Sequence, residues 1–347
     1  MHQAPATGTH PSVEDADRRS AVAALFALAS LSAMPTAATA AASPAAGTTP
    51  ADLARFDNFK ARKGIPMELK QVAPDLWFLY DDLSSNAAFL VTDDGVLVID
   101  SRQHPQHGRE LIAMIRKVTD KPIRWLVNTH AHGDHYYGNP AFRDIGATII
   151  AHRDTVAGMV KNERLEFSRR QSFFRSQGLD PKEVRTVLPD VVFDTTLRIG
   201  SGQRVAEIFY WGPGQNPGDT MIWVPHAKAV FIGGPFARKN WSNMSFSPSI
   251  DGWIALLNKA AALPVDLFLP GHGDVSTRED VLDEARLLAD VQAEVKKAIA
   301  SGLTKEQIVK QLRFPQYADL RNYERIDVFL EALHHLFTTG RPLFPYP

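Results

Sequence analysis

The segment NTHAHGDHYYGN, residues 128–139, carries the strongest signal in this chain. It directly follows IRWLV, residues 123–127, a short apolar run that is typical of a buried strand. Four side chains that can bind a metal ion fall within six positions: His130, His132, Asp134 and His135. Imidazole nitrogen and carboxylate oxygen suit zinc when thiolate is absent, and a turn after a strand can aim several such groups at one point. Exposed loop histidines are the alternative interpretation, which so dense a group of donors disfavours.

The composition of the whole chain narrows the chemistry further. The chain has 347 residues, no cysteine and 12 histidines, and its Lys+Arg count of 38 nearly equals its Asp+Glu count of 39. The absence of cysteine excludes disulfides, iron–sulfur clusters, thiolate-bound zinc and thiol nucleophiles. The balanced charge argues against a nucleic-acid partner, because no excess of basic residues is available to neutralise phosphates. Any metal must therefore be held by histidine and carboxylate.

The N-terminal region predicts export. Residues 1–40 contain Arg18-Arg19, then an apolar stretch at 21–34 and small residues up to Ala40. This order is typical of a signal peptide for the periplasm or for secretion, and the paired arginines favour the twin-arginine route. The apolar stretch is shorter than the ~20 residues of a membrane span, so no span is expected. A disordered alanine-rich tail is the alternative. Residues 41–66 are expected to form a linker.

The remaining sequence alternates short apolar runs with amphipathic stretches. Strands are expected at 76–80, 87–91, 96–100, 123–127, 147–150, 196–199, 204–211, 220–224, 229–232 and 265–269. Helices are expected at 108–118, in the charged region up to 177, and at 251–262, 278–300, 304–312 and 325–338. Hairpins mixed with β-α units in both halves predict an α/β fold, a four-layer αββα sandwich of two packed sheets with helices outside. We assign residues 67–275 to this domain and residues 276–347 to a helical C-terminal extension packed on it.

Three further motifs accompany the histidine segment. Asp100 ends the expected strand 96–100, GPGQNPGDT spans residues 212–220, and PGHG spans residues 270–273. Together with the H-x-H-x-D-H pattern at 130–135, these motifs resemble the metallo-β-lactamase superfamily over roughly residues 68–275. The resemblance implies the αββα fold and a zinc-dependent hydrolase activity. It is specific, because four motifs occur in the family's order with strands between them.

The resemblance also implies two metal sites. His130 and His132 would serve a first zinc, which family members complete with a histidine in the GPGH segment. Asp134, His135 and His272 would serve a second zinc. The residues themselves agree with this division, because side chains at positions i and i+2 point the same way, while Asp134 and His135 face another direction.

Two positions depart from the family's pattern. Gln215 stands where the first site's third histidine would be, and an amide oxygen is a weaker donor to zinc than imidazole. Pro235 stands where many members place a metal-bridging Asp or Cys, and it has no side-chain donor. We therefore expect one firmly bound zinc at the second site and a second zinc that is weak or absent, with Gln215 as a poor ligand or a water-orienting amide.

The local chemistry assigns further roles. Zinc lowers the pKa of a bound water, and the resulting hydroxide would attack an electrophilic carbon. Asp134 and His132 are the catalytic candidates: Asp134 steers the proton, and His132, when free of metal, donates a hydrogen bond to the developing oxyanion. Asp100 and Asp219 are expected to fix imidazole tautomers, with a turn cap as the alternative for Asp219.

The sequence thus predicts a zinc-dependent hydrolase of small molecules, with amide, lactone, ester and activated aryl-halide substrates all open. Trp241 is expected to form a wall for substrate, with core packing as the alternative. An exported accessory hydrolase of a quinoprotein oxidation system is a second hypothesis, and a degenerate member that binds a metal or ligand without turnover is a third. The C-terminal helices are expected to dock on the domain, with a homodimer surface or a roof over the active site as alternatives.

Overall fold

A computed structural model describes residues 67–82 and 84–344. The predicted export signal at 1–40 and the expected linker at 41–66 both precede this range and lie outside the described residues. In the part of the chain that is described, no helix is long and apolar enough to cross a membrane.

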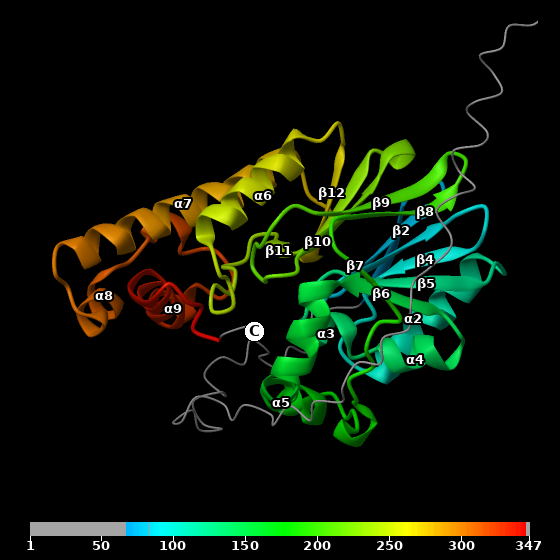
Figure 1. The fold of residues 1–347 in the computed structure, drawn as a ribbon, viewed down its shortest axis with the longest axis horizontal. Coiled ribbons are helices and arrows are strands. Elements are labelled where there is room, and N and C mark those ends of the chain that lie inside the picture. Colours follow the sequence, from blue (N-terminus) through cyan, green and yellow to red (C-terminus); the bar gives the residue numbers. More distant parts are fainter. Residues whose placement is uncertain (1–66, 83, 345–347) are drawn as a thin grey trace, which may run out of the picture. The chain divides into compact units, whose positions relative to one another are not determined.

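The first half of the described chain forms a seven-stranded sheet in sequence order (Figure 1). Its strands are β1 (Glu68–Ala73), β2 (Leu76–Tyr80), β3 (Ala87–Val91), β4 (Val96–Ile99), β5 (Ile123–Asn128), β6 (Thr148–His152) and β7 (Val191–Phe193). Strands β1 to β4 pair antiparallel, and β4 to β7 pair parallel. Strand β7 was not expected, because three residues carry too short a pattern to be recognised.

The second half forms a five-stranded sheet in the order β12-β11-β10-β9-β8. Its strands are β8 (Thr196–Ser201), β9 (Arg204–Tyr210), β10 (Thr220–Val224), β11 (Ala229–Ala237) and β12 (Leu267–His272). Strands β11 and β12 pair parallel, with register shifts from Phe231 to Ala237. Strand β11 runs five residues beyond the expected end at 232, because this irregular stretch accommodates Pro235.

The two sheets face each other across one apolar layer and carry helices on their outer sides, which confirms the four-layer αββα sandwich. Phe78 of the first sheet meets Phe231 of the second at 6.4 Å between ring centroids, within a cluster built from both sheets. Leu111 and Ile115 of α2 cover the outer side of the first sheet. Every residue of β4 and β11 is buried, as expected for strands that are covered on both faces.

The helices of the sandwich differ widely in length. In the first half they are α2 (Pro105–Val118), α3 (Gly133–Tyr136), α4 (Asn139–Asp144) and α5 (Arg153–Ser176). In the second half they are α6 (Ile250–Ala262), α7 (Arg278–Ala300), α8 (Lys305–Gln311) and α9 (Ile326–Thr339).

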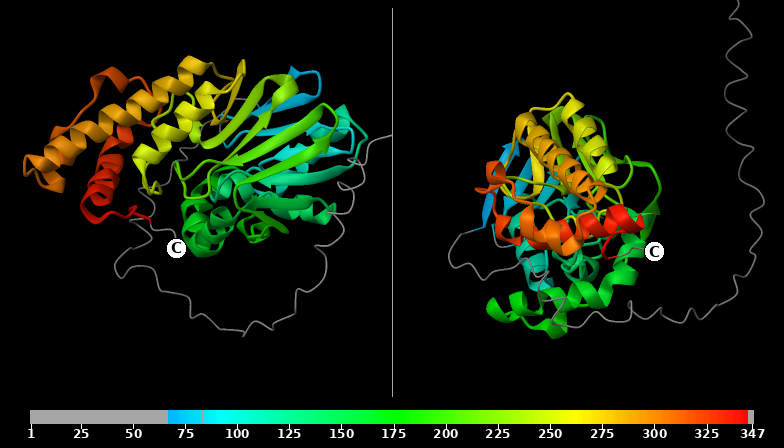
Figure 2. Two further views of the ribbon diagram at one scale, coloured as in Figure 1. Left: turned by 45° about the horizontal axis from the view of Figure 1, so that its top comes forward. Right: turned by 90° about the vertical axis from the view of Figure 1, so that its left-hand side faces the viewer.

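The C-terminal helices α7, α8 and α9 extend the core on the side of the second sheet (Figure 2). Their apolar residues, such as Leu288 of α7 and Leu333 of α9, belong to the same buried cluster as Trp253 of α6 and Phe268 of β12. Thr277 starts α7 with a capping box, which satisfies the free N–H groups of its first turn. The stripes seen in the sequence therefore serve to dock these helices on the second sheet and α6.

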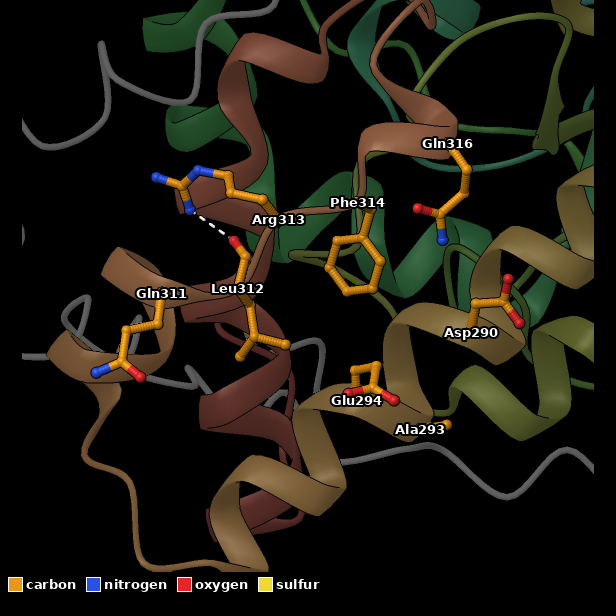
Figure 3. A pocket seen from close by; sticks show the side chains of 8 residues that line it. All are labelled: Asp290, Ala293, Glu294, Gln311, Leu312, Arg313, Phe314 and Gln316. Atoms are coloured by element: carbon orange, nitrogen blue, oxygen red, sulfur yellow. Dashed lines mark hydrogen bonds between the residues drawn. The ribbon is translucent and has the colours of Figure 1, made fainter.

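A hollow of about 470 Å³ lies within this extension, between α7 and the segment that follows α8 (Figure 3). Its lining residues are Asp290, Ala293, Glu294, Gln311, Leu312, Arg313, Phe314 and Gln316. None of them is a predicted metal ligand, so the hollow is separate from the histidine segment.

Candidate metal centre

The histidine segment lies where strands of both sheets end. Strands β4 and β5 run parallel, so Asp100 after the one and the turn after the other reach the same edge of the first sheet. Strand β12 of the second sheet ends at His272, whose Nε2 lies 3.3 Å from Nε2 of His135. The packing of the two sheets thus brings together segments that are 137 positions apart in sequence.

Asp134, His135 and His272 form a complete group of three donors, all within 4.8 Å of one another. Oδ2 of Asp134 lies 3.3 Å from Nε2 of His272 and 3.7 Å from Nε2 of His135. Tetrahedral zinc with bonds near 2.1 Å places its ligand atoms about 3.4 Å apart. The three donors therefore fit one zinc ion and leave a fourth position open.

The outer nitrogen of each imidazole in this group has a partner that fixes the ring. Nδ1 of His135 lies 2.6 Å from Oδ2 of Asp100, and Nδ1 of His272 lies 3.2 Å from the carbonyl oxygen of Ser84. Both partners are acceptors, so each Nδ1 carries the hydrogen and each Nε2 presents its lone pair to the centre.

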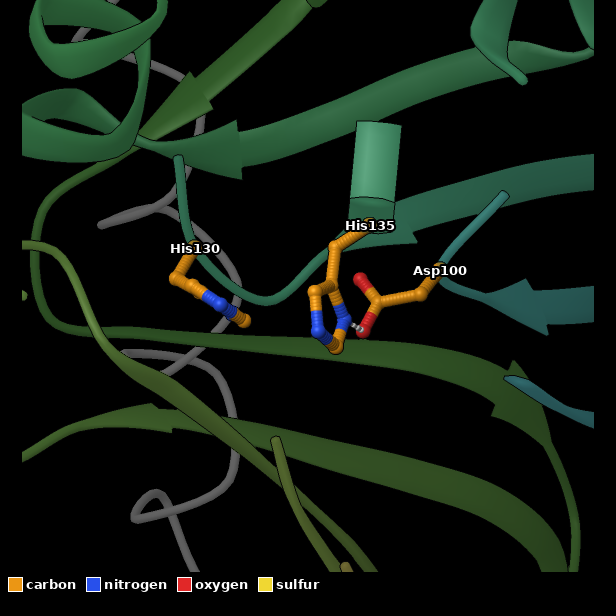
Figure 4. A group of neighbouring side chains, drawn as sticks. All are labelled: Asp100, His130 and His135. Carbon is orange, nitrogen blue, oxygen red and sulfur yellow. Dashed lines mark hydrogen bonds and ion pairs between the residues drawn. The ribbon is translucent and has the colours of Figure 1, made fainter. Parts of the chain in front are cut away.

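Asp100 is fully buried and contacts several residues around the metal-binding group, among them His135 (Figure 4). It accepts 2.8 Å hydrogen bonds from N and Oγ1 of Thr129 in addition to its contact with His135. Burial raises the pKa of Asp100 to about 7, although His130 and Thr129 favour the ionised form. Its φ of 60° is costly for a residue with a side chain, so the surrounding contacts hold it there. Because its oxygens are already engaged, we regard Asp100 as a positioning group.

His130 and His132, the residues predicted for the first zinc, form the core of an incomplete group. Nε2 of His130 lies 3.1 Å from Nδ1 of His132, and Nδ1 of His130 lies 2.9 Å from Oγ1 of Thr129. Gln215 lies beside them: a Cβ on Gly234 would stand 2.7 Å from its Oε1 and 2.8 Å from Nε2 of His130. The structure therefore places the amide of Gln215 beside His130, where its oxygen accepts a 3.3 Å hydrogen bond from Asn216.

Burial sets the charge of these side chains. It lowers the pKa of His130 and His132 well below the ordinary value, and that of His135 to about 3. Neutral imidazole is the form that binds metal, so these rings are ready to ligate at neutral pH. Burial alone would raise the pKa of Asp134, but Arg170, His135 and His272 outweigh it and hold that pKa well below its usual range.

Helix α5 contributes charged residues that the sequence interpretation missed. Arg170 pairs with both Asp134 and Glu166, and Glu166 also accepts hydrogen bonds from N of Gly133 at 2.8 Å and from Arg169 at 2.7 Å. All three side chains from α5 are buried. A signal was present, because positions 166, 169 and 170 share one face of the helix, but a charged helical face is usually a solvated one.

Two predicted roles are corrected. Asp219 touches no imidazole in the described structure: its Oδ2 accepts the N–H of Asn216 at 2.7 Å and holds the turn that carries Gln215, which is the alternative role as a cap. Trp241 is not a wall for substrate, because it is only 1% exposed and enclosed by four rings of the C-terminal extension. Those rings are Phe314, Tyr317, Tyr323 and Phe329.

Comparison with known proteins gives one family. The family model described as the metallo-β-lactamase superfamily matches residues 80–272. The linear primary-alkylsulfatase of Pseudomonas sp. (strain ATCC 19151) is 24% identical over 264 residues, which cover 65% of this chain and 49% of that enzyme. The metallo-β-lactamase type 2 of Bacillus sp. (strain 170) is 25% identical over 222 residues, which cover 61% of this chain and 76% of that enzyme.

Solved structures share the fold. The stereoselective inverting sec-alkylsulfatase Pisa1 from Pseudomonas sp. aligns with a TM-score of 0.62 at 16% sequence identity, covering 78% of this chain and 50% of that one. The chain thus spans about half the length of the alkylsulfatases that it resembles.

Proposed function

The chain belongs to the metallo-β-lactamase superfamily of metallo-hydrolases, and from this premise we propose that it is a zinc-dependent hydrolase of small molecules with one firmly bound zinc. The observation that carries the proposal is the group of Asp134, His135 and His272, whose donor atoms have the separations that tetrahedral zinc requires. Of the two predicted sites, only this one has three strong donors, and Asp100, which with His130 and His135 forms the other close group of donors in the described structure, is engaged by His135 and Thr129; this supports one firm zinc.

The residues of the centre have distinct tasks in such a hydrolase. When bound, zinc lowers the pKa of a water toward neutrality and so provides a nucleophile at neutral pH. Asp134 is held ionised, so its Oδ2 would ligate the metal and steer the proton of a bound water by accepting a hydrogen bond from it. Asp100 keeps the ring of His135 in one tautomer. His130 lies next to this group, with its ring centroid 4.1 Å from that of His135, and His132 lies next to His130.

Amides, lactones, esters and activated aryl halides are the substrate classes that this chemistry serves. Sulfate esters are a second candidate class, because the likeness to an alkylsulfatase covers 78% of this chain and therefore continues past residues 80–272, the range that the family model matches. A hydrolase that serves a quinoprotein oxidation system and a member without turnover remain the competing hypotheses.

Metal removal tests the proposal. We expect the full-length chain to carry about one zinc per molecule, to lose hydrolysis of at least one substrate class when a chelator removes the metal, and to regain it when zinc is returned. The panel should contain an ester, a lactone, a β-lactam, an aryl halide and alkyl sulfates. A chain that stays folded, binds zinc and hydrolyses none of them would favour the non-catalytic hypothesis. A folded chain that binds no zinc would overturn the proposal.

A further inference from the structure

The two carboxylate oxygens of Asp134 have different surroundings. Oδ2 faces the other two donors, at 3.3 Å from His272 and 3.7 Å from His135. Oδ1 points the other way and forms an ion pair with Nη2 of Arg170. One oxygen is therefore directed at the metal position, and the other is already engaged by the protein.

Arg170 is itself held by the same network. Its Nη1 pairs with Oε2 of Glu166, one turn earlier on α5, and that same oxygen accepts the N–H of Gly133 at 2.8 Å. The network thus reaches the metal-binding turn at two adjacent points, the backbone of Gly133 and the side chain of Asp134. Arg169 completes it with a 2.7 Å contact to Oε1 of Glu166.

The charged network around Arg170 is buried, and its charges balance. The side chains of Glu166, Arg169, Arg170 and Asp134 are at most 4% exposed. Their two positive and two negative charges balance, so none of the carboxylates is left uncompensated away from water. The two terminal NH2 groups of a guanidinium form a planar fork that can serve two carboxylates in a fixed geometry, whereas an ammonium group is a single point of charge.

We propose that Arg170 is a positioning residue for the metal centre, which, anchored by Glu166, holds Asp134 so that only Oδ2 is offered to the metal. The inference rests on the proposed function, because it presupposes that zinc binds at Asp134, His135 and His272. Arg170 acts through Asp134 and through the turn at Gly133, and it does not itself meet the metal.

The test compares two substitutions with a matched control on the same helix. Arg170→Lys keeps the charge and loses the fork, Arg170→Met loses both, and Arg175→Met makes the same change at an exposed position of α5. Zinc affinity is measured by competition with a chelator, the visible absorption of the cobalt-substituted protein reports the ligand set, and thermal unfolding of the metal-free protein checks the fold.

We expect Arg170→Lys to fold and to bind zinc about 10–100-fold more weakly than the parent, with an altered cobalt spectrum, and Arg175→Met to match the parent in both. Zinc affinity and a cobalt spectrum of Arg170→Lys that equal the parent's would overturn the inference and leave the proposed function intact. A parent chain that takes up neither zinc nor cobalt would overturn the proposed function, and the inference with it.

Discussion

The two groups of donors lie side by side at one edge of the sandwich, yet only one of them is complete. Asp134, His135 and His272 supply three donors, and each is supported from behind by a different part of the chain. Arg170, Asp100 and the carbonyl group of Ser84 provide that support. In the other group, the third side chain beside His130 and His132 that was predicted as a ligand is the amide of Gln215.

The difference between the groups lies in one ligand and not in the scaffold. Asp219 still holds the turn that brings Gln215 to the incomplete group, and Gly234 still leaves room for it there. Nε2 of His132 is buried and meets no hydrogen-bond partner within the described residues. The incomplete group has therefore kept its geometry, and what it lacks is a strong third donor.

Removing one ligand from each group in turn should have the largest effect on zinc content. It directly tests whether the two groups differ in metal binding. We expect His272→Ala to lower zinc content from about one per chain to near zero and to abolish hydrolysis, because only two donors of the complete group remain. His130→Ala should keep about one zinc per chain. Metal analysis after gel filtration measures both, with His334→Ala on α9 as a control histidine. Equal loss of zinc in His272→Ala and His130→Ala would show that the groups do not differ as we describe.

Adding a third strong donor to the incomplete group of His130 and His132 should have an intermediate effect on zinc content. Gln215→His places an imidazole where the amide now lies beside His130, so we expect zinc content to rise from about one to about two per chain. The measurement is metal stoichiometry under zinc buffering, and Gln177→His at the exposed end of α5 is the control. An unchanged stoichiometry in Gln215→His would contradict our assignment of this group as a degenerate metal site.

A substitution of Glu284, far from both groups, should change the stability of the fold and leave zinc content unchanged. Glu284 of α7 is 5% exposed, and burial raises its pKa to about 8, although a hydrogen bond with Ser242 lowers it in part. In the unfolded chain its pKa is near 4.5, so between these values the folded state keeps a proton that the unfolded state releases. Stability contributed by protonated Glu284 therefore declines as pH rises above about 4.5, and the loss is complete above about pH 8.

We accordingly expect Glu284→Gln to match the parent in melting temperature near pH 4 and to exceed it by several degrees near pH 9, with unchanged zinc content. The shift corresponds to a free-energy cost on the order of 3–5 kcal/mol in the parent at high pH. Calorimetric melting curves across this range provide the measurement. A constant offset between parent and variant at all pH values would contradict the ionisation argument.

Much of the fold was predictable because its signals are local. The expected strands at 96–100 and 123–127 coincide with β4 and β5 to within one residue, and the stripes at 278–300 and 325–338 coincide with α7 and α9 equally closely. The three-residue strand β7 was missed because so short a segment has no period, and β11 was underestimated because Pro235 interrupts its pattern. The role given to Trp241 was wrong because a tryptophan in an irregular segment looks the same in sequence whether it faces solvent or the core.

The sequence by itself determined which side chains can ligate a metal, because their chemistry and their close spacing at 130–135 are properties of the chain alone. It also determined that the incomplete group of His130 and His132 has an amide in place of a third imidazole. Only the tertiary structure decided how those side chains are held. The buried partners of Asp134 and His135 come from α5 and from the residue after β4. A charged residue looks the same in sequence whether its side chain faces water or a buried carboxylate. Distance in space, which sequence spacing does not encode, made Arg170 part of the metal centre.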